Sequence, residues 1–223
     1  FVIGTIQENI KTLSSELQIL NSNTPIKLSD LLDVSAVTPA DGDTLVYNVD
    51  YNIFEPKAQS GGSGGGSGVG TIALGIGAGQ TTQGDYAVAI GFGAGNSLQL
   101  DSAVAIGRAA GNTNQGDNSV AIGYNAGQTT QGNNAIALGM TAGKTGQLAA
   151  AVAIGELAGE TTQGSSAVAI GVYAGQFTQG NDAIALGRTA GNGNQGINSV
   201  AIGHEAGKTN QGINSVAIGH EAG

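Results

Sequence analysis

The sequence predicts a mainly β protein, a homotrimeric parallel β-roll solenoid preceded by a short trimeric coiled coil and a small mixed module. Three observations predict this fold. The phrase hydrophobic–Ala–hydrophobic–Gly returns with an unbroken period of 16 residues between Thr71 and Gly223. Apolar residues near the N-terminus follow heptad spacing, and glycine makes up 40 of the 223 residues while aromatic residues make up only 4%. A period this short and strict indicates a solenoid in which each repeat forms one coil of backbone.

Residues 1–21 are predicted to form a coiled-coil segment. Apolar residues there are spaced alternately by three and four, with polar residues between them. Isoleucine at both core positions of the heptad favours trimers or larger bundles over dimers. A single amphipathic helix packed on its own domain is the alternative interpretation. The predicted seam consists of Ile3, Ile6, Ile10, Leu13, Leu17 and Leu20.

Residues 22–59 are expected to form a small α/β module for trimerisation or attachment. Strand candidates at Thr44–Tyr47 and Asn52–Glu55 flank a turn, which predicts a hairpin. A module with so little apolar mass and no cysteine needs more core, which three copies around an axis would supply. The stretch Leu28–Asn48 also resembles modules in structural and fibre proteins of tailed bacteriophages.

Residues 60–70, SGGSGGGSGVG, form a Gly/Ser linker that is predicted to be flexible, and residues 71–223 form the repeat array. The sequence does not distinguish a native linker from an inserted one. Because Phe1 is not an initiator Met and Gly223 falls within a tenth repeat, we expect the chain to be a fragment or a processed product.

Each repeat is expected to contain one strand that is apolar on both faces. Counting from the closing glycine as zero, position −2 is Ala in all ten repeats, and positions −3 and −1 are Val, Ile or Leu. A strand that is apolar on both faces is buried on both, and one coil covers only one of them. Identical chains are expected to cover the other, and the sequence leaves open which face that is. The predicted core or interface residues are Val88, Ala89, Ile90, Val120, Ala121, Ile122, Val168, Ala169 and Ile170.

Glutamine occupies position +8 in all nine complete repeats, from Gln83 to Gln211. Coils stacked about 4.8 Å apart would let these amides bond to one another as a ladder. The alternative is that each glutamine bonds to the backbone of its own turn. The two repeats with Leu100 and Leu148 in place of glycine at position +9 are expected to differ locally.

The variable positions +1, +2, +5, +7, +10 and +11 are expected to be exposed and to carry any recognition. Two histidines one period apart would stack, and metal capture is conceivable there, but such residues more often form an exposed variable face, so no metal site is predicted. The candidate recognition residues are Phe92, Arg108, Tyr124, Tyr173, Arg188, His204 and His220.

Composition and context argue against several functions. A net charge of −9 disfavours nucleic acid, and no apolar run approaches the roughly 20 residues that span a bilayer. The glycines of Gly75–Gly79 and Gly91–Gly95 imitate a dinucleotide-binding loop, but they lack its strand–loop–helix context. No catalytic residues and no cofactor are predicted, so we do not expect an enzyme.

The motif SVAIG-x-x-A at Ser119–Ala126, Ser199–Ala206 and Ser215–Ala222 resembles the head repeat of trimeric autotransporter adhesins, the YadA-like left-handed parallel β-roll. The resemblance covers about two thirds of the chain. It implies rolls that pack as a trimer around a common axis and bind host surfaces. The 16-residue period is longer than that family's usual repeat, the coiled coil precedes the head, and no membrane anchor is recognised. The segment AGQTTQG (Ala126–Gly132) is also similar to arrays in phage and large-virus fibre proteins.

These resemblances favour a virion fibre protein, a tail or capsid fibre that serves as a rigid spacer or head for attachment, located on the virion surface or otherwise extracellular. Expected partners are further copies of the chain, other virion structural proteins through the N-terminal region, and a host cell-surface glycan or protein. Nucleic acid and membrane insertion are not expected. One alternative is the head of a bacterial trimeric adhesin. The second is a monomeric ice-binding solenoid, suggested by the frequent threonines at position +6.

Overall fold

The computed structural model describes residues 43–48, 53–58 and 68–223. The chain divides into two compact units, Phe1–Gln59 and Ser60–Gly223. The predicted coiled-coil seam, most of the small module and most of the linker lie outside the described residues. Within those ranges the structure contains no helix, and accordingly none that is long and apolar enough to cross a membrane.

The described part of the first unit is an antiparallel hairpin. Strands β1 (Asp43–Asn48) and β2 (Ile53–Ala58) pair along their full lengths, with Asn48 opposite Ile53. The sequence predicted this hairpin but ended its second strand at Glu55. The ladder continues to Ala58 through Pro56. Proline has no backbone N–H to donate, and it is tolerated here because each strand of a two-stranded sheet has one free edge where no donor is needed.

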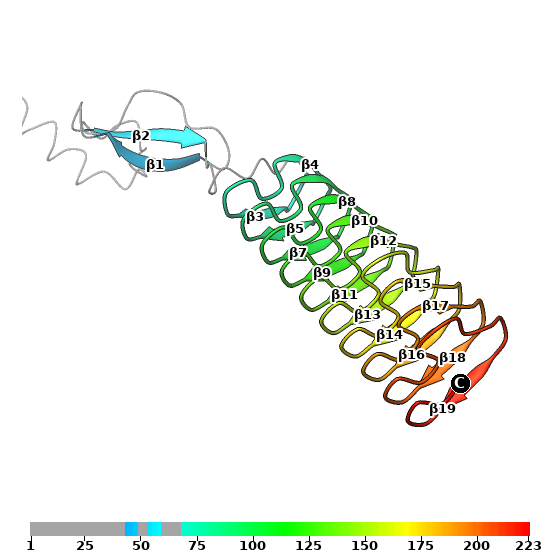
Figure 1. The fold of residues 1–223 in the computed structure, drawn as a ribbon. Coiled ribbons are helices and arrows are strands. Elements are labelled where there is room, and N and C mark those ends of the chain that lie inside the picture. The colour runs from blue at the N-terminus through cyan, green and yellow to red at the C-terminus, as the bar shows by residue number, and fades with distance from the viewer. Residues whose placement is uncertain (1–42, 49–52, 59–67) are drawn as a thin grey trace, which may run out of the picture. The chain divides into compact units, whose positions relative to one another are not determined.

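The second unit is a parallel β-solenoid with one coil per 16 residues, as predicted, and Figure 1 shows its coils stacked in sequence order. Its main element is a ten-stranded parallel sheet, here called the long sheet, in which each residue pairs with the residue 16 positions on. The strands are β3 (Ile72–Leu74), β5 (Val88–Ile90), β7 (Val104–Ile106), β9 (Val120–Ile122), β11 (Ile136–Leu138), β13 (Val152–Ile154), β14 (Val168–Ile170), β16 (Ile184–Leu186), β18 (Val200–Ile202) and β19 (Val216–Ile218).

A second wall of the solenoid carries the segments that end in glutamine. Here the strands form one five-stranded sheet and one two-stranded sheet, together called the short sheets, linked and extended by single bridges between glutamines. The strands are β4 (Thr81–Gln83), β6 (Ser97–Gln99), β8 (Thr113–Gln115), β10 (Thr129–Gln131), β12 (Thr145–Gln147), β15 (Thr178–Gln179) and β17 (Asn194–Gln195).

The interior of the solenoid is filled by small side chains and one glutamine per coil. Alanines at positions −2 and +3 form the buried cluster, as Ala137 and Ala142 illustrate with no exposed surface. Position +12 points inward as well and is always Ala or Ser, and Ser119 donates there to the carbonyl oxygen of Gly116 at 2.6 Å. In the described coils the larger apolar side chains of the long sheet lie on the outside instead.

The buried glutamines bond both to one another and to the backbone, so the two arrangements that the sequence left open occur together. Nε2 of Gln147 donates to the carbonyl oxygens of Ile136 at 2.8 Å and Ala151 at 3.2 Å, and to Oε1 of Gln163 at 3.0 Å. Each such amide joins the two walls of its own coil and also bonds to the next coil. The amide-to-amide bond recurs at Gln83–Gln99, Gln131–Gln147, Gln163–Gln179 and Gln179–Gln195.

The closing glycine is required for two separate reasons. Gly123 has φ +132°, a conformation that L side chains rarely adopt. A Cβ atom there would also lie 2.5 Å from the carbonyl oxygen of Gly139 in the next coil. At Gly219, in the last coil, φ is +122° but the nearest atom to a built Cβ is 3.9 Å away. The chain therefore contains a matched pair that separates backbone strain from stacking.

We predict that Gly219→Ala lowers the free energy of unfolding by about 1–2 kcal/mol, the cost of a strained backbone conformation. Gly123→Ala should cost several kcal/mol, since it adds the clash with the next coil. Chemical denaturation followed by circular dichroism measures both. Equal losses for the two variants would show that coil stacking does not constrain this position.

We also predict that Gln147→Leu lowers the free energy of unfolding by about 2–4 kcal/mol, because it removes three buried hydrogen bonds and interrupts the amide ladder between coils. Thr129→Ala on the exposed side of β10 is the control and should change it by less than about 0.5 kcal/mol. Thermal unfolding of the two variants in parallel provides the measurement. A Gln147→Leu variant as stable as the control would refute a structural role for the ladder.

Candidate functional surfaces

The outer face of the long sheet is an apolar stripe. Every strand turns its alanine inward and its two branched side chains outward, so Ala89 and Ala121 are fully buried. Ala169 is buried in the same way, and it belongs with them to the core. The remaining predicted core or interface residues are half-buried on the outer face, and they are Val88, Ile90, Val120, Ile122, Val168 and Ile170.

The apolar stripe runs the whole length of the array. Ten strands are separated by nine intervals of about 4.8 Å, which makes the stripe about 43 Å long. Its end strands are the most exposed, with Val216 at 68% and Ile218 at 63%. Soluble monomers rarely expose a continuous apolar patch of this extent, so the stripe has the character of an interface.

Six of the seven candidate recognition residues form a single column, here called the +1 column, at the corner that follows the long sheet. Neighbouring members touch along the solenoid. The guanidinium of Arg108 lies 5.5 Å from the centroid of the Tyr124 ring, and the rings of His204 and His220 stack at 5.0 Å. Phe92 is 59% exposed. The members are Phe92, Arg108, Tyr124, Arg188, His204 and His220.

Tyr173 lies apart from this column. It occupies position +2, is half-buried and has φ +62°. Position +2 is in the left-handed region in every repeat, whichever residue occupies it, so its backbone is set by the turn. The sequence grouped Tyr173 with the exposed residues because position +2 varies.

The C-terminal end of the +1 column carries a cluster of charged groups. Nη2 of Arg188 bonds to Nε2 of His204, and Nζ of Lys208 donates to Oε2 of Glu205 at 3.1 Å. The hydrogen bond from Lys208 lowers the pKa of the Glu205 carboxyl, and the nearby basic side chains lower that pKa further. Desolvation acts in the opposite direction and raises it. No group of three or more His, Cys, Asp or Glu side chains placed to hold a metal occurs in the described part of the chain.

Position +10, which the sequence counted among the recognition positions, has a structural role instead in much of the array. Its Asp or Asn side chain accepts the backbone N–H of the residue one coil earlier. Oδ1 of Asp101 accepts from Asp85 at 2.9 Å, and Oδ1 of Asn133 accepts from Asp117 at 3.1 Å. The frequency of Asp and Asn at this position was the sequence signal that could have identified these side-chain-to-backbone hydrogen bonds between coils.

The threonine face considered for ice binding is discontinuous. The five-stranded short sheet ends at β12, and Thr161 and Thr209 lie outside any strand. Phe177 and Gly193 occupy the same position in the coils between them. A regular, flat rank of threonines is therefore confined to the first half of the array, where Ser97 already interrupts it.

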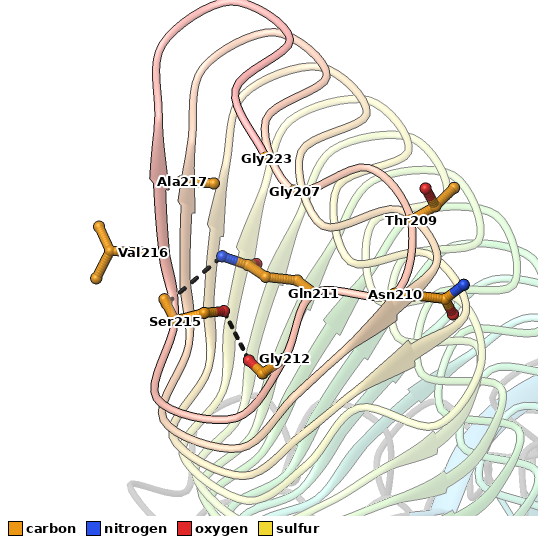
Figure 2. A pocket seen from close by; sticks show the side chains of 9 residues that line it. All are labelled: Gly207, Thr209, Asn210, Gln211, Gly212, Ser215, Val216, Ala217 and Gly223. Atoms are coloured by element: carbon orange, nitrogen blue, oxygen red, sulfur yellow. Dashed lines mark hydrogen bonds between the residues drawn. The ribbon is translucent and has the colours of Figure 1, made fainter.

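Described residues of the second unit line shallow depressions, of which two are considered in turn. One, of about 280 Å³, lies beside Leu98, Leu100 and Asn114, where the repeat departs from its usual residues. The other, of about 210 Å³, lies at the C-terminal end, where Gln211 and Ala217 border the open last coil (Figure 2). Neither gathers a set of catalytic groups.

We predict that Lys208→Met raises the pKa of Glu205 toward its ordinary value, because the variant removes the hydrogen bond that lowers it. A lowered folded-state pKa adds stability above the unfolded-state pKa, and that stability is lost as the pH falls through the folded-state pKa. NMR titration of the Glu205 carboxyl carbon measures the shift. Lys144→Met, whose partner is Glu160, should leave the Glu205 titration unchanged, and an unmoved pKa in Lys208→Met would contradict the assignment.

Comparison with known protein families agrees with the geometry. The family model of the YadA head domain repeat matches the chain twice, at residues 67–94 and 115–142. No curated protein and no solved structure gives a significant match. Each matched segment spans two neighbouring strands of the long sheet with one short-sheet strand between them, β3–β4–β5 in the first and β9–β10–β11 in the second. Over these two segments the array is therefore similar to YadA head repeats.

Proposed function

We propose that this chain is a structural fibre protein of a virion, whose array serves as a homotrimeric rigid spacer and head for attachment to a host surface. The observation that carries the proposal is the unbroken apolar stripe on the outer face of the long sheet. The YadA-like repeats support an adhesin-like fibre head in general, and the stripe supplies a physical reason for a trimer.

Three copies around one axis would cover the three apolar stripes together. Two outward branched side chains on each of ten strands give twenty per chain. Moving a half-buried aliphatic side chain out of water contributes on the order of 1 kcal/mol. Even after the cost of association, such a contact is large enough to hold a trimer together. The buried alanines cannot serve as this interface because they already fill the interior.

The same arrangement suits a spacer that presents weak contacts. Backbone bonds and side-chain ladders join each coil to the next, which makes the array stiff along its length. The +1 column lies at the corner beside the stripe and offers aromatic and basic side chains. A trimer would present this column three times, so modest single contacts would add up to useful avidity.

A virion is the setting we favour over a bacterial cell, because the N-terminal module and the AGQTTQG repeats resemble those of phage and large-virus fibres. The N-terminal unit would then join other virion structural proteins, and the host ligand would be a surface glycan or protein. The location would be the virion surface or another extracellular setting. The alternative is the head of a bacterial trimeric adhesin. Sequencing the parent gene and its surroundings distinguishes the two. A stalk with a membrane anchor would indicate the adhesin, and neighbouring virion genes would indicate the virion fibre.

We predict that the chain sediments at equilibrium as a trimer near three times 21.8 kDa, and that Ile122→Asp shifts it to the monomer mass. The substitution places a charge in the middle of the proposed interface, where desolvation without a partner is costly. Thr113→Asp on the short-sheet wall is the matched control and should remain trimeric. A wild-type chain that sediments as a folded monomer would refute the trimer and favour the solenoid alternative.

Attachment is tested with the same proteins. Fluorescently labelled wild-type and Thr113→Asp chains should bind candidate host cells, whereas Ile122→Asp should bind at least about tenfold more weakly through loss of avidity. Equal binding by trimer and monomer would show that any attachment does not depend on threefold presentation.

A further inference from the structure

We propose that Arg108 and the aromatic rings of Phe92 and Tyr124 form a binding site for an acidic glycan, through a sugar that carries a carboxylate or sulfate group. These three residues are here called the Arg108 site. The inference rests on the proposed function, in which the +1 column carries recognition, and it names the ligand class for one part of that column. The site occupies three inner coils of the array, with described coils on both sides.

Arg108 is a cation without a polar partner. It is exposed, and within residues 68–223 its guanidinium forms no hydrogen bond and no ion pair. The other Lys and Arg side chains in that range are engaged. Lys144 and Lys208 pair with glutamates, at 3.9 Å and 3.1 Å between nitrogen and oxygen, and Arg188 bonds to a histidine. Arg108 is therefore the basic side chain best placed to bind an anion from outside the chain.

The positions next to Arg108 in its turn carry no carboxylate. In the coils of Phe92, Arg108 and Tyr124, positions −1, +2 and +5 hold only isoleucine, glycine, alanine, asparagine or glutamine. The next carboxylate along the +1 column is that of Glu156, three coils beyond Arg108, which is about 14 Å. At physiological ionic strength, surface charges more than about 8 Å apart are largely screened from each other. An anion could therefore approach Arg108 without repulsion from this column.

The contact between Arg108 and Tyr124 orients the guanidinium without using its hydrogen-bond donors. The guanidinium carbon lies 5.5 Å from the centroid of the Tyr124 ring, within the range of a cation–π interaction. A guanidinium held over a ring keeps its N–H edge free, and that planar edge can donate two parallel hydrogen bonds to a carboxylate or sulfate. The site thus holds its charged group in place before a ligand arrives.

The two rings offer flat apolar surface one coil before and one coil after Arg108. Phe92 is 59% exposed, and Tyr124 is 45% exposed despite its contact with Arg108. Two coil intervals separate them by about 9.6 Å, which is about the length of a disaccharide. A sugar ring has an apolar face of C–H groups that packs on an aromatic ring, while its hydroxyls stay in water. Neighbouring sugars could therefore pack on the two rings while an acidic group reaches Arg108.

A glycan fits this site better than an acidic peptide. A peptide that binds as an added strand needs a sheet edge with unpaired backbone groups. Here β5, β7 and β9 are each paired on both sides, and the carbonyl oxygens of Phe92, Arg108 and Tyr124 already accept bonds of 2.8–3.0 Å from the next coil. A ligand at this corner is therefore held chiefly by side chains, which suits a molecule recognised through its ring faces and its charge.

The test applies the full chain to an array of immobilised glycans that holds sialylated, uronate-containing and sulfated members beside their neutral counterparts. The wild type should bind acidic members and not the neutral ones. Arg108→Gln should bind them at least about tenfold more weakly, because it removes the charge-assisted hydrogen bonds. Arg188→Gln is the matched control, since it changes the same residue type in the same column at a side chain that is already bonded. It should bind as the wild type does.

A second pair of variants tests the rings. Tyr124→Ala should weaken binding at least about fivefold, whereas Tyr124→Phe, which keeps the ring, should bind as the wild type does. Circular dichroism confirms that each variant is folded. Equal binding by Tyr124→Ala and Tyr124→Phe would overturn the proposed role of the ring, and with it the site.

Three other results would also overturn the proposal. They are no binding to any acidic glycan, binding by Arg108→Gln equal to that of the wild type, and binding to soluble poly-L-glutamate that matches the glycans, which would indicate an acidic peptide instead. Sedimentation equilibrium and cell binding of the same variants report the proposed function separately. A trimer that attaches to cells equally well with and without Arg108 would support that function and overturn this site.

Discussion

The close contact between successive coils is the constraint on which the rest of this structure depends. Each coil repeats the backbone of the one before it, and the hydrogen bonds join residues in constant register. At the closing glycine the neighbouring carbonyl lies where a Cβ would be, as at Gly123. One inserted or deleted residue would move every later side chain to a different position, so the strict period of the sequence is a physical requirement of the stack.

The same contact determines where apolar residues can lie. A 16-residue coil encloses little volume, and alanine, serine and one glutamine fill it. The glutamine amide spans the interior and donates to carbonyl oxygens on both sides of the coil, such as those of Ile136 and Ala151 for Gln147. With the interior full, the branched side chains of the long sheet have only the outer face. A coil this thin therefore produces an apolar exterior stripe as a direct consequence of its size.

The sequence predicts the coil length and the parallel sheet from the 16-residue period, and it predicts the hairpin of β1 and β2 from two strand-like segments around a turn. It could not choose between alanine and the branched residues as the inner face, because both are apolar and the choice depends on coil diameter. Variation alone also did not indicate the local structural role of some positions. The +10 carboxylates and amides vary because Asp and Asn accept the same backbone bond, and Tyr173 occupies a turn whose backbone conformation is independent of its side chain.

A rigid repeat of this kind separates stability from recognition. The residues that hold the stack point inward or belong to ladders, and each is restricted to one or two residue types. The +1 column projects outward after the closing glycine, where its members contact chiefly one another. Substitution there changes the surface of the solenoid without altering the contact between coils. Non-glycine residues in the left-handed region at +2 and +11 cost about 1 kcal/mol each, and the ladder bonds of the same coils offset that cost. An array built in this way can change its outward surface while its length and stiffness stay the same.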